Sequence, residues 1–270
     1  MDYIILDIEF NGRKFASELP MEVIEIGAVR LNEQLEQVDT FTAFIKPVYF
    51  TKLNSFIQKK TGIPQEEIDR ADRFPAVSER FLQWLARSES LIFVTWGKED
   101  MKRIILDTRM HKLSDQYWME TPYFDLLKGF TSYKGLTNDV SVEGALEMLA
   151  LEGSGQAHRA LDDAIMTAQI FRAIFNELDF TRKQYFVDTY TNAKERRALK
   201  NAVRLLRSHK LEPTWENYAE KFLKEKIESE DPRKLAEMKL HFEKEAAKPY
   251  KAKPARPQKK AVQEENSSKQ

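Results

Sequence analysis

The feature that most constrains the fold is an apolar run near the start of the chain that carries two acids. Residues 3–11 read YIILDIEFN, and the first four have the unbroken apolar character of a strand buried on both faces. Side chains alternate along a strand, so Asp7 and Glu9 point to the same side of it. Two adjacent buried carboxylates repel each other and resist the loss of water. A bound divalent cation compensates for both costs, so this strand is a candidate metal site.

The simpler alternative is an edge strand whose two acids face water or pair with Lys or Arg. A second segment favours the metal site. VTWGKED, residues 94–100, ends another buried strand and opens a helix. Glu99 or Asp100 therefore lies near the carboxyl edge of that strand, where open sheets bind ligands. Capping of the first helical turn is an alternative explanation for these acids.

A third segment, AHRALDDA, places His158 ahead of a helix whose first turns carry Asp162 and Asp163. Helical spacing favours Asp162 as the partner of His158, because residues at i and i+4 share a face. A His158 that lies in the preceding loop leaves either Asp available. A surface or capping histidine is the simpler interpretation when this segment is taken by itself.

Strand and helix patterns up to about residue 178 predict a mixed sheet covered by helices. The strand patterns cover residues 3–10, 23–31, 40–47, 91–96 and the start of 121–127. The helical patterns cover residues 52–87, 97–110, the end of 121–127, 142–151 and 159–178. Short connections between the first three strands favour antiparallel neighbours.

The composition changes after residue 178. Segments 181–209, 213–228 and 232–247 have helical patterns with many charges, and residues 248–270 are rich in Lys, Pro, Gln and Ser. We expect a first domain at 1–178, a charged helical extension at 179–247 and a disordered tail at 248–270.

Charge is divided unequally between the two parts of the chain. Residues 179–270 carry 23 Lys and Arg against 15 Asp and Glu, and residues 1–178 carry 20 against 28. An acidic first part joined to a basic second part suggests contact with a polyanion.

The sharpest basic feature is NAKERRALKNAVRLLRSHK, residues 192–210, in which Glu195 is the single acid. Leu199, Val203 and Leu206 recur at helical spacing, so an apolar side can dock while a basic side faces outwards. We expect this side to bind the phosphate backbone of a nucleic acid, with a solvated surface helix as the alternative. The candidate substrate-binding residues are Arg196, Arg197, Arg204 and Arg207.

Composition also indicates the cellular compartment in which we expect the protein. The chain has no cysteine, which excludes disulfides and Cys-ligated zinc and suits a reducing cytosol. A strand pattern starts at the N-terminus without a leader pattern, and no apolar run reaches the roughly 18 residues of a membrane span. We therefore expect a soluble, cytoplasmic protein that does not contact membranes.

Taken together and in this order, the motifs form a larger pattern. A D-x-E at Asp7 and Glu9, a mid-chain Asp after a strand, and an H-x-x-x-x-D ending at Asp163 resemble the DEDDh 3′-to-5′ exonucleases. EVIEIGAV, TGIPQEEIDRADRF and HRALDDA extend the resemblance over residues 1 to about 178. Within the family, TWGKED and HRALDDA are most similar to KapD-type bacterial proteins and to the histone-mRNA and small-RNA exonucleases.

The resemblance implies a ribonuclease H-like α/β fold, a five-stranded mixed sheet flanked by helices, here with a helical basic extension. It implies two Mg²⁺ or Mn²⁺ ions that stabilise the attacking and leaving oxygens of an in-line displacement. The implied metal ligands are Asp7, Glu9, Asp100 and Asp163.

The resemblance makes His158 the general base and selects Asp163 over the Asp162 that helical spacing favours. Phe10 occupies the position of a threonine that is usual in the family, and we expect its ring to stack on the 3′-terminal base. A core aromatic on a buried strand is the alternative for Phe10.

We therefore predict a metal-dependent exonuclease that releases nucleoside 5′-monophosphates from the 3′ end of single-stranded nucleic acid, with RNA favoured over DNA. One alternative is an inactive nucleic-acid-binding or regulatory protein on the same fold. Another is a proofreading subunit that docks on a polymerase. The sequence identifies no protein partner.

Overall fold

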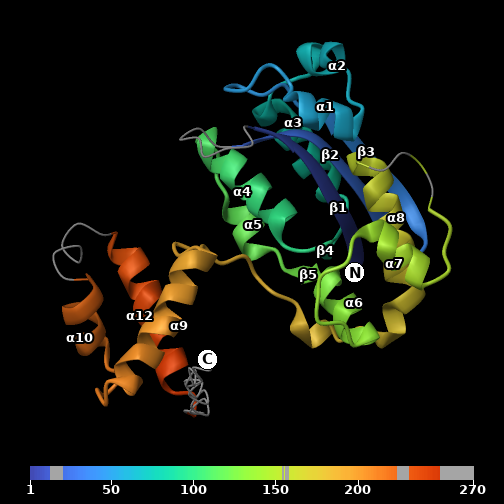
Figure 1. Ribbon diagram of the computed structural model, residues 1–270. Coiled ribbons are helices and arrows are strands. Elements are labelled where there is room, and N and C mark those ends of the chain that lie inside the picture. The colour runs from blue at the N-terminus through green and yellow to red at the C-terminus, as the bar shows by residue number, and fades with distance from the viewer. Residues whose placement is uncertain (13–20, 154, 156–157, 224–230, 250–270) are drawn as a thin grey trace, which may run out of the picture. The chain divides into compact units, whose positions relative to one another are not determined.

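Five strands form one mixed sheet in the order β3-β2-β1-β4-β5 (Figure 1). The strands are β1 (Asp2–Asn11), β2 (Glu22–Leu31), β3 (Gln37–Phe44), β4 (Leu91–Thr95) and β5 (Tyr123–Asp125). β2 runs antiparallel to both β1 and β3, whereas β4 runs parallel to both β1 and β5. The predicted mixed five-stranded sheet is confirmed. β3 begins earlier than the expected residue 40, because Gln37 already pairs with Leu31 of β2.

The computed structural model describes residues 1–12, 21–153, 155, 158–223 and 231–249. The chain divides into two compact units, Met1–Val187 and Asp188–Gln270. Most of the segment predicted to be disordered, from residue 250 onwards, lies outside the described residues.

Helices cover both faces of the sheet in the first unit (Figure 1). They are α1 (Ser55–Thr61), α2 (Gln65–Arg70), α3 (Phe74–Leu85), α4 (Glu99–Met110), α5 (Gln116–Glu120), α6 (Leu126–Lys134), α7 (Val142–Met148) and α8 (Ala160–Ile174). Two short 3₁₀ helices follow, η1 (Phe175–Glu177) and η2 (Phe180–Arg182).

The central strand β1 is buried on both faces and divides the core in two. Ile4, Leu6 and Ile8 pack in one apolar cluster with residues of α3 and α4. Tyr3 and Ile5 pack in the other cluster with residues of α6, α7 and α8. Because side chains alternate along a strand, the odd-numbered residues of β1 face the α8 side.

Residues 179–187 belong to the first unit. The Phe180 ring lies 4.9 Å from that of Phe124 and 5.8 Å from that of Tyr3, measured between centroids. Gln184 forms a bridge with Tyr123 at the edge of β5. The sheet and its aromatic core therefore extend past residue 178, where the change in composition placed the domain boundary.

The second unit contains α9 (Ala193–Ser208), α10 (Trp215–Tyr218), the π-helical turn η3 (Ala219–Leu223) and α12 (Pro232–Ala246). The last of these confirms the helix predicted at 232–247. The helix predicted at 181–209 begins only at Ala193, because Asn192 and Glu195 form a capping box there. Residues 224–228 of the helix predicted at 213–228 lie outside the described residues.

A small apolar core holds these helices together. The Val203 side chain of α9, the Tyr218 side chain of α10 and the Phe242 side chain of α12 are all buried in it. The apolar side predicted for segment 192–210 is thus confirmed as the face of α9 that packs inwards.

Among the helices that the structure describes, none combines the length and the apolar character that crossing a bilayer requires.

Candidate active site

The carboxyl half of β1 carries the first two predicted site residues. Asp7 lies opposite Gly27 of β2, and Glu9 lies opposite Glu25. The register shifts between Glu9 and Phe10, so a bulge ends the regular pairing directly after the second acid. As the period of the strand predicts, Asp7 and Glu9 share the face of the sheet that α8 covers.

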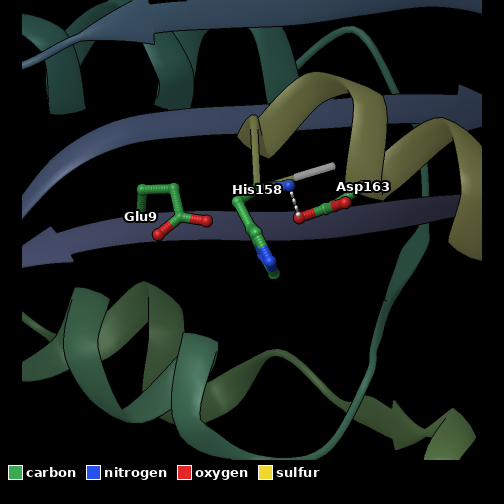
Figure 2. A group of neighbouring side chains, drawn as sticks. All are labelled: Glu9, His158 and Asp163. Atoms are coloured by element: carbon green, nitrogen blue, oxygen red, sulfur yellow. Dashed lines mark hydrogen bonds between the residues drawn. The ribbon is translucent and has the colours of Figure 1, made fainter. Parts of the chain in front are cut away.

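His158 and Asp163 approach Glu9 from the start of α8 (Figure 2). Oxygen or nitrogen atoms of Glu9, His158 and Asp163 all lie within 4.8 Å of one another. The backbone of His158 has a φ of 66°, in the left-handed region, and its N–H donates to Asp163 Oδ2 at 3.1 Å. The structure thus places His158 in the turn before the helix and pairs it with Asp163, whereas helical spacing favoured Asp162.

An ion pair on β2 holds the residue that follows His158. Arg159 donates to both carboxylate oxygens of Glu25, with Nη2 to Oε1 at 2.9 Å, and Glu25 is only 1% exposed. The same carboxylate accepts a hydrogen bond from the Ala160 N–H at 3.2 Å. This pair joins residues far apart in sequence and fixes the first turn of α8 against β2.

Gly27 allows the start of α8 to come this close. A Cβ built on Gly27 lies 2.1 Å from the backbone of Ala160 and Leu161, which no side chain tolerates. Two residues of the EVIEIGAV motif therefore have a structural role. Glu25 binds the start of α8 to the sheet, and Gly27 leaves room for it.

Asp100 reaches the site from the other side of β1. It lies in the first turn of α4, after a turn in which Gly97 has a φ of 98°, and it is buried. Burial raises the pKa of its carboxyl, and hydrogen bonds from the backbone N–H groups of Asp100 itself and of Ile8 in β1 oppose this increase. The helix N-terminus favours the negative charge as well.

Burial raises the pKa of all four carboxyls, and it is the largest cause in each case. The pKa of Glu9 is raised to about 8, that of Asp100 to about 7 and that of Asp163 to about 6. The pKa of Asp7 is raised well above its ordinary value by burial, and the negative charges of the other three acids raise it further.

These residues fit a divalent metal centre. Asp163 Oδ1 is buried and accepts no hydrogen bond within the described part of the chain. Glu9, Asp163 and the imidazole of His158 form one group of metal donors, and the charges of Asp100 and Asp163 act on the neighbouring Asp7. Hard cations such as Mg²⁺ and Mn²⁺ prefer carboxylate oxygens. A bound cation would supply the positive charge that this cluster lacks.

Two charged residues near the site were missed by the sequence analysis. The positive charge of Lys60, at the end of α1, lowers the pKa of both Glu9 and Asp163. Burial lowers the pKa of His158, and Lys60 lowers it further, whereas Glu143 of α7 opposes this effect. The only sequence signal for Lys60 was its place directly before the TGIPQ segment.

The remaining predicted contacts lie elsewhere. Phe10 is half-buried, packs against the core on the α4 side and has the guanidinium of Arg103 5.2 Å from its ring centroid. This position is what the core alternative for Phe10 predicts, and the ring lies on the opposite face of β1 from Asp7 and Glu9.

The four predicted arginines of α9 fall into two pairs. Arg196 donates to the carbonyl of Thr191, and Arg207 donates to the carbonyls of Ala246 and Lys248, the latter at 3.0 Å. Arg197 and Arg204 are exposed side chains. Half of the predicted basic face therefore stabilises the second unit itself.

Comparison with known proteins identifies the same region. A model of the exonuclease family matches residues 4–171. The chain is 30% identical over 179 residues to the 3′-5′ exoribonuclease 1 of Mus musculus, which covers 63% of this chain and 52% of the mouse protein. It is 26% identical over 186 residues to the probable 3′-5′ exonuclease KapD of Bacillus subtilis, covering 67% of this chain and 87% of KapD.

A solved structure is also similar to this chain. The nuclease domain of 3′hExo, a DEDDh family member bound to rAMP, superposes with a TM-score of 0.62 at 26% identity. The superposition covers 69% of this chain and 97% of that domain. The chain spans about half the length of the mouse relative.

Proposed function

The chain belongs to the exonuclease family, and we propose that it is a metal-dependent 3′-to-5′ exonuclease that releases nucleoside 5′-monophosphates from single-stranded nucleic acid. The observation that carries this proposal is the cluster of four carboxylates beside His158, of which Glu9, Asp100 and Asp163 are buried and Asp7 is half-buried. A cluster with so little compensating charge costs stability, and a catalytic metal centre gives a reason to keep it.

In this proposal Asp7, Glu9, Asp100 and Asp163 hold two divalent cations, Mg²⁺ or Mn²⁺. When bound, the cations supply positive charge that stabilises the attacking and leaving oxygens of an in-line displacement at phosphorus. The protein contributes a rigid frame for them, because two ligands lie on the central strand and two lie in the first turns of helices packed on it.

His158 acts as the general base. Its lowered pKa keeps the imidazole neutral at pH 7, so it can accept a proton from the attacking water. The hydrogen bond from its N–H to Asp163, and the ion pair between Arg159 and Glu25, hold the backbone that positions the ring.

We propose RNA as the preferred substrate. The mouse relative is named an exoribonuclease, and the similar solved domain was bound to rAMP. The position of Phe10 on the α4 side of β1 favours a place in the core over a contact with the 3′-terminal base. The basic face of α9 remains a proposed site for the phosphate backbone, with Arg197 and Arg204 as its exposed guanidinium groups. The cysteine-free composition supports a cytoplasmic location as part of this proposal.

The complete set of four acids and His158 favours an enzyme over an inactive binding protein on the same fold, since loss of a single ligand disables such a site. A proofreading subunit differs from a free-standing enzyme in one testable respect. It copurifies with a polymerase, whereas the enzyme proposed here degrades single strands without one.

The experiment is a cleavage assay with single-stranded RNA and DNA of one sequence, labelled at the 5′ end. We expect a ladder of products shortened from the 3′ end with Mg²⁺ or Mn²⁺, none with chelator, and faster cleavage of RNA. Asp100→Asn should be inactive, and Glu99→Gln, which changes the exposed neighbouring acid, should be active. Absence of metal-dependent cleavage of either substrate by the wild-type protein would contradict the proposal.

A further inference from the structure

A loop and a short helix are fixed to the end of the catalytic strand by buried side chains. Asn11, the last residue of β1, is fully buried. Its side-chain amide donates to the carbonyls of Phe50 and Lys52 at 2.9 and 3.0 Å, and its Oδ1 accepts from the Asn54 N–H at 2.9 Å. One side chain thus ties residues 50–54 to the strand that carries Asp7 and Glu9.

A buried carboxylate fixes the same loop from the other side. Glu22, the first residue of β2, is 1% exposed and accepts hydrogen bonds from three successive backbone N–H groups, those of Val48, Tyr49 and Phe50. Charge-assisted hydrogen bonds to a buried carboxylate are strong, so the backbone of this turn is held in one conformation.

Hydrogen bonds also fix the start of helix α1, which follows this loop directly. Asn54 caps its first turn by accepting from the Phe56 N–H at 2.9 Å, and its side chain donates to the Gly12 carbonyl at 3.1 Å. Gln65 ties the loop further by accepting from the Leu53 N–H and donating to the Thr51 carbonyl. The helix ends at Gly62, whose φ of 68° places it in the left-handed region.

This rigid frame displays aromatic rings and lysines to solvent. Tyr49 is 49% exposed and Phe56 is 60% exposed, on backbone that is fixed by the bonds above. Tyr49 and Lys52 also line a groove of about 310 Å³, together with Asn11 and Asn54. Exposed aromatic rings interleaved with lysines are typical of surfaces that bind single-stranded nucleic acid.

One face of α1 leads from this surface to the catalytic carboxylates. Phe56 and Lys60 are four residues apart, so they lie on the same face, about 6 Å from each other along the axis. α1 packs against β1, and the charge of Lys60 acts on both Glu9 and Asp163. The charge of Lys60 thus acts on two of the site carboxylates, and Phe56 lies one helical turn away on the same face.

We infer that Tyr49, Lys52, Phe56 and Lys60, which we call the α1 surface, bind the nucleotides on the 5′ side of the one being removed. Tyr49 and Phe56 stack on unpaired bases, and the two lysines contact the phosphates between them. The inference rests on the proposed function, because the polarity of the strand follows from removal of its 3′ nucleotide.

The binding of a single strand of about ten nucleotides, a length within the range of single-strand sites, tests the α1 surface. It is measured with the full-length protein in chelator, by fluorescence anisotropy, so the readout does not depend on catalysis. The variant with both Tyr49→Ala and Phe56→Ala should raise the Kd by roughly tenfold per ring. Tyr49→Phe with Phe56→Trp should restore binding, and Tyr133→Ala, an exposed ring of α6, should not change it.

Cleavage of a dinucleotide is the second readout. It should be unchanged in the double alanine variant, since a dinucleotide does not reach the outer rings. Unchanged affinity of that variant for the long strand would overturn the inference and leave the proposed function intact. Failure of the wild-type protein to cleave either substrate with Mg²⁺ or Mn²⁺ would overturn the proposed function, and the binding assay would still decide whether the surface exists.

Lys60 has its own test. Lys60→Gln should weaken binding of the long strand. It should also lower the slope of log Kd against log salt concentration by about one, the value expected for one lost phosphate contact. Lys59→Gln removes a charge of equal size from the same helical turn and serves as the matched control. Equal effects of the two variants would show general charge attraction and would contradict a specific place for Lys60.

Discussion

The two units of this protein treat charged side chains in opposite ways. In the first unit four carboxylates are gathered around the central strand, where burial and mutual repulsion raise their pKa values. In the second unit the acids are compensated. Glu195 caps α9 and pairs with Lys234 at 2.9 Å, and Glu237 accepts hydrogen bonds from Thr191.

The direction of the pKa shifts follows this difference. The pKa of Glu195 is lowered by hydrogen bonds from Asn192 and Lys234, and that of Glu237 is also lowered. An acid whose pKa is lowered stabilises the folded chain in its charged form, whereas an acid whose pKa is raised destabilises it. Charge thus serves stability in the second unit, whereas in the cluster of Asp7, Glu9, Asp100 and Asp163 it is retained at a cost in stability, which marks this cluster as the candidate functional centre.

The contrast between the two units predicts the largest effect for a substitution of Asp7. Asp7→Asn should lower the cleavage rate by more than tenfold, since a loss of about 1.4 kcal/mol in transition-state stabilisation already has that effect. The same change should raise the Tm of the metal-free protein, because it removes one of four repelling charges. Cleavage assays and thermal melts in chelator measure both. A variant that keeps more than about a tenth of the wild-type rate would rule out an essential role of Asp7 as a metal ligand.

His158 should have the next largest effect. His158→Ala should lower turnover by roughly 10²–10⁴-fold, the usual contribution of a general base, with little change in Tm or metal affinity. His209→Ala in the second unit is the control and should leave turnover unchanged. A large fall in Tm with near-normal turnover per folded molecule would instead show that His158 is a structural capping residue.

The ion pair between Arg159 and Glu25 should affect turnover by positioning His158. Arg159→Met leaves the buried Glu25 carboxylate without its ion-pair partner, so we expect turnover to fall by about tenfold or more, as a 1.4 kcal/mol loss of positioning implies. The KM for a dinucleotide should change less than kcat. If Arg159→Lys, which keeps the charge but not the paired contact, restores kcat fully, then charge matters more than geometry.

Reversal of the exposed basic residues of α9 should have a smaller effect. Arg197→Glu with Arg204→Glu should weaken binding of long single strands several-fold and flatten the salt dependence, because phosphate contacts dominate that dependence. Cleavage of a dinucleotide and the Tm should change little. Arg207→Glu is the contrasting variant, since Arg207 holds the carbonyls of Ala246 and Lys248, and it should lower the Tm. Unchanged affinity and salt slope in the double variant would exclude α9 from substrate binding.

The smallest expected effect is a dependence of stability on pH that originates in the first unit. In the unfolded chain Glu9 and Asp163 ionise near pH 4, whereas in the folded chain they ionise near the raised pKa values of about 8 and about 6. Between these limits the folded state binds more protons than the unfolded state, so stability falls as the pH rises from about 4 to about 8.

Thermal melts in chelator should therefore show a Tm that declines over this range, and Mg²⁺ or Mn²⁺ should raise the Tm more at pH 8 than at pH 5. Metal ions bind the ionised carboxylates, so they oppose the loss. Asp7→Asn should make the decline shallower, and Glu195→Gln in the second unit should not. A metal effect that is the same at both pH values would contradict this account.

Much of this molecule is determined by local sequence patterns. The period of β1 determined that Asp7 and Glu9 share a face, and the apolar stripes determined which sides of α8 and α9 pack inwards. Such patterns act between residues two to four apart, so they can be recognised without knowledge of the rest of the chain. They also placed Asp100 and His158 at the starts of helices, and the resemblance to the exonucleases supplied their grouping.

The way in which these helices and strands meet depends on contacts between segments that are distant in sequence. Spacing favoured Asp162, but the left-handed turn at His158 directs its N–H to Asp163. The bond between Arg159 and Glu25 joins α8 to β2, and the bonds of Asn11 join β1 to residues 50–54. Hydrogen bonds and close approaches between distant segments depend on how helices and strands stack, and no local pattern encodes that. The same reason explains why the charge of Lys60, ordinary in sequence, acts on Glu9 and Asp163.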